Sequence, residues 1–179
     1  DSTSLGANAV TGTATQSNTN EATRVGVGAT EPCSGEVFTA TSAIIGKTMT
    51  SFTMDLAHSG ETGTMLMGVF DDQNCDIRST FRTLNVGTDI PSTYPSSFGS
   101  FTATGSHVIS AGDLVGLKFT SGSTGNVYYT SQNTDDYDGS NSYNQEEGYP
   151  MDVTGRDATF TINYDTPSDY TTNISGSLD

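Results

Sequence analysis

The chain is poor in basic residues and has no long apolar run. Its 179 residues include 6 Lys and Arg residues against 21 Asp and Glu residues, and the formal net charge is -15. A nucleic-acid backbone or an anionic lipid surface needs a basic protein face, so this balance excludes both as partners. No apolar run approaches the roughly 20 residues that span a bilayer, and membrane insertion is not predicted either.

The sequence also offers little material for a catalytic centre. It has two histidines, His58 and His107, and each lies beside a turn, so both are expected at the surface. It contains no GxSxG, HExxH or CxxC motif, and neither a serine nucleophile elbow nor a zinc site is predicted. Glu146 and Glu147 are adjacent, so in a strand they would point apart instead of forming the carboxylate pair of a glycosidase. The chain is therefore not predicted to be an enzyme.

Alternation of apolar and polar residues is the strongest positive signal. A strand turns successive side chains to opposite faces, so apolar residues at every second position bury one face and expose the other. Only 32% of the residues are hydrophobic, but the numerous Thr residues also suit a pleated surface. The clearest alternating sets are Phe52, Met54 and Leu56; Val115, Leu117 and Phe119; and Ala158, Phe160, Ile162 and Tyr164.

Strand-like segments of this kind recur at short intervals between turn-forming residues, and no helical period is sustained. This pattern predicts an all-β fold, an antiparallel jelly-roll-like β-sandwich of about nine or ten strands. The segment 63–71 has apolar residues on both faces, which predicts a central strand. The predicted strands cover residues 22–29, 36–43, 48–58, 63–71, 80–86, 98–104, 113–121, 126–132 and 158–164.

The composition changes at both ends of this region. Residues 1–20 are small and polar and are predicted to form an N-terminal arm. The sandwich is predicted to span residues 21–164. Residues 165–179 form a C-terminal tail that Pro167 separates from the last predicted strand.

Two cysteines, Cys33 and Cys75, lie in polar, turn-like contexts. In a chain rich in Thr, Ser and Asn they favour a single disulfide, with two free buried thiols as the alternative. The chain begins with Asp1 and not with Met, so we expect a processed, secreted protein of the extracellular space or cell surface. Asn173 begins an N-glycosylation sequon, a triplet that also arises by chance in such a chain.

Calcium is the predicted cofactor, because it takes six to eight oxygen ligands from carboxylates, amides and carbonyls. One candidate loop has four such residues around a glycine that eases a sharp turn, and a second oxygen-rich loop is the weaker candidate. The alternative is an acidic, solvated surface that repels its own copies. The first loop contains Asp135, Asp136, Asp138 and Asn141, and the second contains Asp71, Asp72, Asn74 and Asp76.

The segment 134–157 interrupts the strand pattern with acidic residues and tyrosines. Function tends to lie on the loops of rigid sandwiches, so this long loop is the predicted functional surface. Because no tryptophan is present, its tyrosines Tyr137, Tyr143 and Tyr149, together with Tyr128, are the candidates for stacking on a glycan. The alternative is a solvated crossover whose tyrosines cover the edge of the core.

Several stretches carry a resemblance to a known family. KTMTSFTMDL, ISAGDLVGLKFTSGSTGNVYYT, DDYDGSNSY and GRDATFTINY follow one another in an order that resembles the secreted jelly-roll domains of archaeal cell-surface proteins. The resemblance covers about residues 22–164. These domains are similar in shape to carbohydrate-binding modules, and similar jelly rolls build extracellular archaeal tubes and threads. There, a terminal segment of one subunit fills the sheet of the next, and calcium can lie at the contacts.

The resulting hypothesis is a structural subunit of an extracellular filament, tube or coat, whose partners are copies of itself. Strand exchange would use small apolar residues of the arm, Leu5, Ala7 and Ala9, or the alternating Tyr170 and Ile174 of the tail. The alternative is a carbohydrate-binding or adhesive cell-surface domain with glycans as partners.

Overall fold

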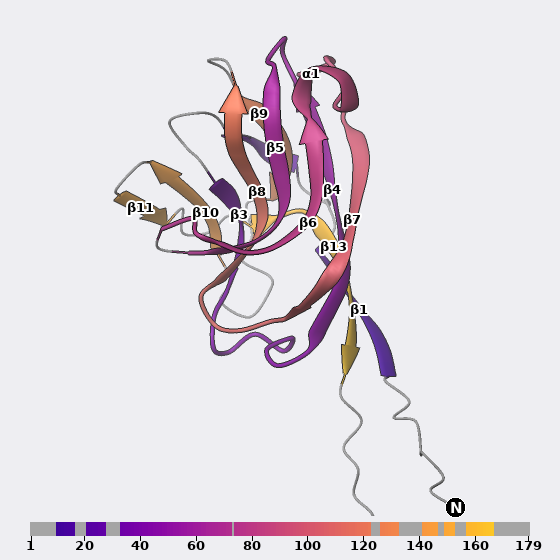
Figure 1. Ribbon diagram of the computed structural model, residues 1–179, viewed down its shortest axis with the longest axis vertical. Coiled ribbons are helices and arrows are strands. Elements are labelled where there is room, and N and C mark those ends of the chain that lie inside the picture. The colour runs from indigo at the N-terminus through magenta and orange to yellow at the C-terminus, as the bar shows by residue number, and fades with distance from the viewer. Residues whose placement is uncertain are drawn as a thin grey trace, which may run out of the picture.

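The fold is an antiparallel β-sandwich, as predicted. A computed structural model describes residues 10–16, 21–27, 33–72, 74–122, 126–132, 141–146, 149–152 and 157–166. These residues form two β-sheets that pack against each other (Figure 1). In this part of the chain the single helix is α1, a turn of four residues at Val86–Asp89.

The first sheet is built around β4 and is called the β4 sheet. Strand β4 pairs with β7 along one edge and with β13 and β9 along the other, while β1 pairs with β13 and β2 with β9. The strands of this sheet are β1 (Val10–Gln16), β2 (Glu21–Val27), β4 (Thr48–His58), β7 (Gly99–Val108), β9 (Val127–Gln132), β12 (Asp157–Ala158) and β13 (Phe160–Thr166).

The second sheet, called the β5 sheet, has the order β11-β10-β3-β8-β5-β6. The chain crosses between the sheets at most connections, so β3, β4 and β5 alternate from one sheet to the other, as in a jelly roll. The strands of this sheet are β3 (Cys33–Phe38), β5 (Gly63–Asp71), β6 (Ile77–Asn85), β8 (Asp113–Gly122), β10 (Asn141–Glu146) and β11 (Tyr149–Asp152).

Part of the predicted N-terminal arm belongs to the sandwich. Residues 10–16 form β1, which pairs in register with β13 from Val10↔Thr166 to Gln16↔Phe160. The sequence signal was weak because β1 has no large apolar side chain beyond Val10. Pairing instead uses the open backbone edge of β13, and the Thr13 hydroxyl donates to the Asn163 side chain at 2.9 Å.

The prediction of one long loop over residues 134–157 is wrong for residues 141–146 and 149–152. These residues form the hairpin β10–β11, which extends the β5 sheet beyond β3. Their sequence, NSYNQE and YPMD, lacks the apolar alternation of a half-buried strand. Strand β10 is ordered by backbone pairing with β3, and β11 by pairing with β10, and the local sequence gives no signal for either pairing.

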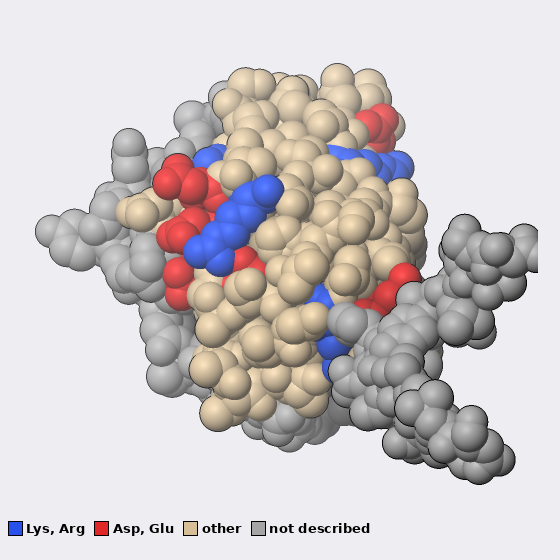
Figure 2. Space-filling view, turned by 60° about the horizontal axis from the view of Figure 1, so that its bottom comes forward, with Lys and Arg blue, Asp and Glu red and all other residues tan. Residues whose placement is uncertain are grey.

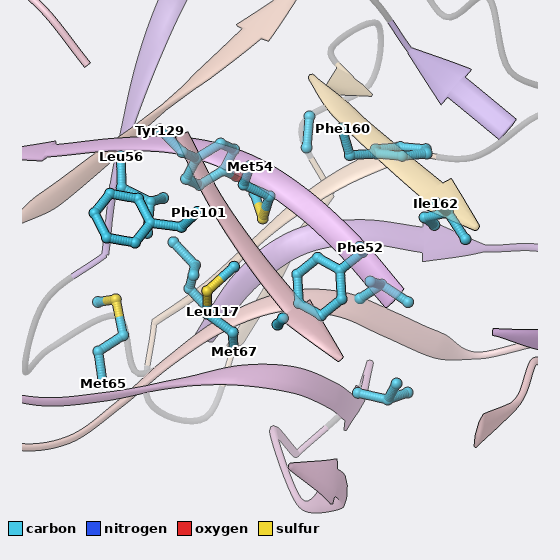
Figure 3. Packing of buried hydrophobic residues seen from close by; sticks show 14 of the residues in the cluster. Phe52, Met54, Leu56, Met65, Met67, Phe101, Leu117, Tyr129, Phe160 and Ile162 are labelled. Carbon is cyan, nitrogen blue, oxygen red and sulfur yellow. The ribbon is translucent and has the colours of Figure 1, made fainter. Parts of the chain in front are cut away.

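The inward faces of both sheets form the main core. On β4 the side chains of Phe52, Met54 and Leu56 are buried, which confirms the predicted alternation. They face Met67 of β5 and Leu117 of β8 across the sandwich (Figure 3). The intervening residues of β4 are half-buried or exposed, so the strand has one apolar and one polar face.

Strand β5 is buried on both faces, as its sequence predicted. Met65, Met67 and Val69 join the main core, whereas Leu66 and Phe70 join a second apolar cluster on the other side of the β5 sheet. The second cluster also contains Val37, Leu114 and the predicted disulfide between Cys33 and Cys75, whose Cα atoms are 5.8 Å apart.

Removal of the disulfide should destabilise the fold strongly. The bridge joins β3 to the turn after β5 across a sequence separation of 42 residues. We expect the double variant Cys33→Ala/Cys75→Ala to lose about 3–4 kcal/mol of unfolding free energy, chiefly through a less constrained unfolded chain. Urea unfolding of wild type and variant measures this loss. Alkylation of the wild type without reductant should modify no thiol, and two modified cysteines would contradict the bridge.

Candidate functional site

Several predicted site residues lie outside the part of the chain that is described. For Asn141, Tyr143 and Tyr149 the structure describes the backbone, on β10 and β11, and not the side chain. The calcium and glycan predictions at these positions therefore stay predictions. The residues outside the described ranges are Leu5, Ala7, Ala9, Asp135, Asp136, Tyr137, Asp138, Tyr170, Asn173 and Ile174.

The second predicted calcium loop is a tight turn whose first carboxylate is already paired. The Asp71 side chain forms an ion pair with Arg78 and accepts a hydrogen bond from the backbone N–H of Asn74 at 3.2 Å. The N–H of Cys75 donates to the carbonyl of Asp71, and Cys75 has a positive φ of 56°. Among the described residues no group of three or more His, Cys, Asp and Glu side chains is placed to hold a metal.

A fully buried carboxylate, Asp113 at the start of β8, is the centre of a polar cluster. Its neighbour across the strand pair is Asp71, so two carboxylates lie opposite each other. Arg78 forms ion pairs with both and thereby compensates their repulsion. The hydrogen bond with Asp113 raises the pKa of Arg78 above its ordinary value, so the guanidinium stays charged. The backbone N–H of Ser110 also donates to Asp113, at 2.7 Å.

The same cluster connects the two sheets through His107. Its Nε2 lies 2.9 Å from Asp113, and its Nδ1 lies 2.8 Å from the hydroxyl of Ser79 on β6. The expectation of a surface histidine is wrong here, because the side chain is only 16% exposed. In a catalytic triad, serine, histidine and aspartate side chains are hydrogen-bonded in this order, and the serine is the activated nucleophile. Here Arg78 already balances the carboxylate, and the bonds tie the edge strands β6 and β7 together.

The outer face of the β4 sheet has rows of polar side chains that cross four strands. One row consists of threonines in register, Thr15 on β1, Thr161 on β13, Thr53 on β4 and Thr102 on β7. The hydroxyls of Thr53 and Thr102 are 2.7 Å apart and hydrogen-bonded. All four side chains are half-buried or exposed, so they form part of the surface.

A second row runs parallel to the first. It contains Thr13, Asn163, Ser51 and Thr104 in register across the same strands. The Asn163 amide accepts from Thr13 and donates to the Ser51 hydroxyl at 2.9 Å. The side chains therefore hold one another in place, and neither row contains a charged residue.

Three aromatic rings lie at the end of this face where β4 finishes. Tyr128 of β9 lies opposite Ala57, and Tyr94 from the loop before β7 stacks on its ring with centroids 3.7 Å apart and planes at 12°. Phe98 meets Tyr94 edge to face at 6.3 Å. The loop is fixed to β4, because His58 donates its N–H to Pro91 and accepts from the N–H of Tyr94. All three rings are half-buried.

The expectation of a surface position is also wrong for His58, because this residue is only 3% exposed. Its Nδ1 accepts a hydrogen bond from the N–H of Gly60 at 3.0 Å, so in the neutral ring the proton is on Nε2. Glu61 closes the same turn by accepting from the N–H and the hydroxyl of Ser59. Burial alone would raise the pKa of Glu61, but the hydrogen bonds from the backbone of Glu61 and Ser59 and from the Ser59 hydroxyl together lower it.

The charges that one face of the molecule shows are grouped. Figure 2 shows Asp and Glu side chains beside Lys and Arg side chains on the left of the view, with smaller groups of both kinds on the right, while most of the described surface in that view has neither. Sequence reasoning missed the uncharged rows, although the alternating polar positions of β4 and β7 were a usable signal. It missed Asp113 because no local pattern separates a buried aspartate from a turn aspartate.

No protein-family model matches this chain, and no curated protein matches it. Within the described residues, no helix is long and apolar enough to cross a membrane.

Loss of the buried carboxylate should be costly. Asp113→Ala removes the partner of Arg78 and His107, and we expect a loss of about 3 kcal/mol of unfolding free energy. The matched control is Asp76→Ala, which removes an exposed carboxylate from the neighbouring turn and should change the unfolding free energy by less than about 0.5 kcal/mol. Equal effects of the two variants in urea unfolding would show that the cluster contributes nothing.

The Glu61 turn should make stability depend on pH. A lowered pKa in the folded state contributes stability that is present above the unfolded-state value of 4.5 and is lost as the pH falls through the folded-state pKa. Wild type should therefore exceed Glu61→Gln in unfolding free energy at about pH 7, and the difference should shrink toward about pH 3. Paired urea titrations measure it, and a difference that does not change with pH would contradict the assignment.

Proposed function

We propose that the chain is a structural subunit of an extracellular filament, tube or coat, in which copies join by exchange of a terminal strand. The observation that carries the proposal is the pairing of Val10 with Thr166. These residues are the first and last that the structure describes, so the chain enters and leaves the sandwich at adjacent points of one edge. The ends of the described sandwich therefore lie side by side at one end of the β1–β13 ribbon.

Strand β1 is suited to exchange because, among the described strands, it pairs with β13 alone. The bonds between them include Thr11 to Asp165 at 3.2 Å and Thr13 to Asn163 at 2.9 Å. If β1 left its own sheet and paired with the β13 of the next copy, these contacts would be replaced by identical ones. Exchange of an identical element is a low-cost route to assembly.

Close packing of Gly12 against Tyr164 specifies this pairing. A Cβ at Gly12 would lie 2.4 Å from a carbon of the Tyr164 ring, so only glycine fits beneath the ring in this position. The same ring lies under the Lys47 ammonium, with 4.3 Å between Nζ and the ring centroid. The Tyr164 side chain of β13, with Lys47, the residue before β4, over its ring, thus specifies the position of β1.

The net charge of -15 opposes assembly of identical chains, so polymerisation needs a counterion or an uncharged contact. Calcium at the acidic segment that contains Asp135, Asp136 and Asp138 is the counterion we propose. A secreted location fits this function and the disulfide, because disulfides persist in oxidising compartments. The resemblance to archaeal cell-surface jelly rolls adds the expectation of an archaeal source.

Deletion of residues 1–20 should abolish polymers while the remaining sandwich still folds. The deletion removes β1, whose pairing lies entirely at the edge of the β4 sheet. Electron microscopy of the native protein, with and without calcium, measures assembly, and far-UV circular dichroism checks folding. Polymers formed equally well by the truncated chain would contradict strand exchange, and a full-length monomer at high concentration with calcium would contradict the function itself.

A point variant tests the same contact without deletion. Gly12→Val places a side chain where the Tyr164 ring lies and should shorten or abolish polymers. Thr15→Val is the matched control, because it changes an exposed position of the same strand and adds no clash. Equal polymer lengths for the two variants would exclude β1 as the exchanged strand.

A further inference from the structure

The outer face of the β4 sheet has the two polar rows and, at one end, the three aromatic rings. Along β4, the positions on this side pass from Ser51 and Thr53 in the polar rows, through the exposed Asp55, to Ala57, which is fully buried opposite Tyr128. Outward residues of one strand are about 6.6–6.8 Å apart. The whole series therefore lies within the reach of a short oligosaccharide.

The aromatic rings form a wall at one end of this series. Tyr128 and Phe98 flank Ala57 from β9 and from the residue before β7, and Tyr94 contacts both rings. On the other side of Tyr128 its register partner in β2 is Gly26. Ring faces and edges of this kind pack against the C–H groups of a sugar.

Asp55 is the outward residue of β4 that precedes Ala57, so its carboxylate lies next to the wall. It is exposed, lies opposite Ser100 of β7, and has no ion pair or hydrogen bond of its side chain among the described residues. A carboxylate can accept two hydrogen bonds at once, as the two neighbouring hydroxyls of a hexose offer them. Thr53 and Thr102 in the next row supply further donors and acceptors, at fixed positions because they bond to each other.

The charge of the face selects the ligand. Asp55 is the carboxylate beside the rings, and the two rows next to it have no charge. A second carboxylate on this face, Asp165, lies beyond the second row and accepts a hydrogen bond from the Thr11 hydroxyl, so Asp55 is the carboxylate that a ligand beside the rings meets. An anionic polysaccharide would be repelled by a chain of net charge -15. A neutral polymer rich in hydroxyls fits both the rows and the rings.

We propose that this face is a binding site for a neutral polysaccharide built from hexopyranose units. One sugar ring packs against the wall of Tyr94, Phe98 and Tyr128, its neighbouring hydroxyls bond to Asp55 and Ser100, and the next unit lies over Thr53 and Thr102. The site is distinct from the tyrosines of segment 134–157 and does not depend on strand exchange.

Native gel electrophoresis in the presence of soluble polysaccharides tests this site. The probes are a mannan, a β-glucan and a galactan, with alginate as the anionic comparison. We expect at least one neutral polymer to retard the full chain and alginate not to. Asp55→Asn and Tyr128→Ala should each weaken the retardation by about tenfold in apparent Kd, whereas Tyr128→Phe should keep it, since the ring is what packs.

The matched control is Thr83→Ala, an exposed threonine on β6 of the opposite sheet, which should bind like wild type. Asp55→Asn keeps an exposed side chain of the same size, so its effect does not depend on whether Tyr128→Ala folds. No retardation by any of the three neutral polymers overturns the proposal. Retardation that survives both Asp55→Asn and Tyr128→Ala, or that occurs with alginate alone, overturns it as well.

Discussion

The pleat of β4 is the constraint on which the rest of the structure depends. This strand pairs with β7, β9 and β13, so it sets the register of the whole β4 sheet. Its inward side chains supply Phe52, Met54 and Leu56 to the core, and its outward side chains form the polar surface. Because the side-chain period is two, a shift of one residue would exchange the two faces completely. Core packing therefore also fixes where every hydroxyl of the outer face lies.

The turn after β5 shows how a short acidic segment can become structural. Asp71 pairs with Arg78, Cys75 is bonded to Cys33, and Lys118 donates to the carbonyl of Cys75 at 2.5 Å. The turn is thereby attached to β3, β6 and β8 at once. The Asp71 carboxylate and the Cys75 carbonyl thus help to hold the β5 sheet together.

The sequence was sufficient for the features that depend on local alternation or on two cysteines. It predicted the sandwich, the one-sided burial of β4, the two-sided burial of β5 and the disulfide. It could not predict β10, because the order of this strand comes from pairing with β3, which is more than a hundred residues away in the chain, and β11 pairs in turn with β10. It misjudged His58 and His107 for a similar reason. The neighbouring turn was visible in the sequence, but the distant partners were not: the loop of Pro91 and Tyr94 for His58, and Ser79 and Asp113 for His107.

The adjacency of Val10 and Thr166 also decides how the sandwich responds to mechanical force. A pull applied through these two points acts at one end of the antiparallel β1–β13 ribbon and perpendicular to its strands. The hydrogen bonds between the strands would then break one after another, as in a zipper, and not together, as they would in shear. The first contacts to fail would be Thr11 with Asp165 and then Thr13 with Asn163, whereas the core around Phe52 would bear no tension until β1 had separated. The β1–β13 ribbon is thus a weak mechanical element in series with a stiff one, and it would yield before the sandwich unfolds.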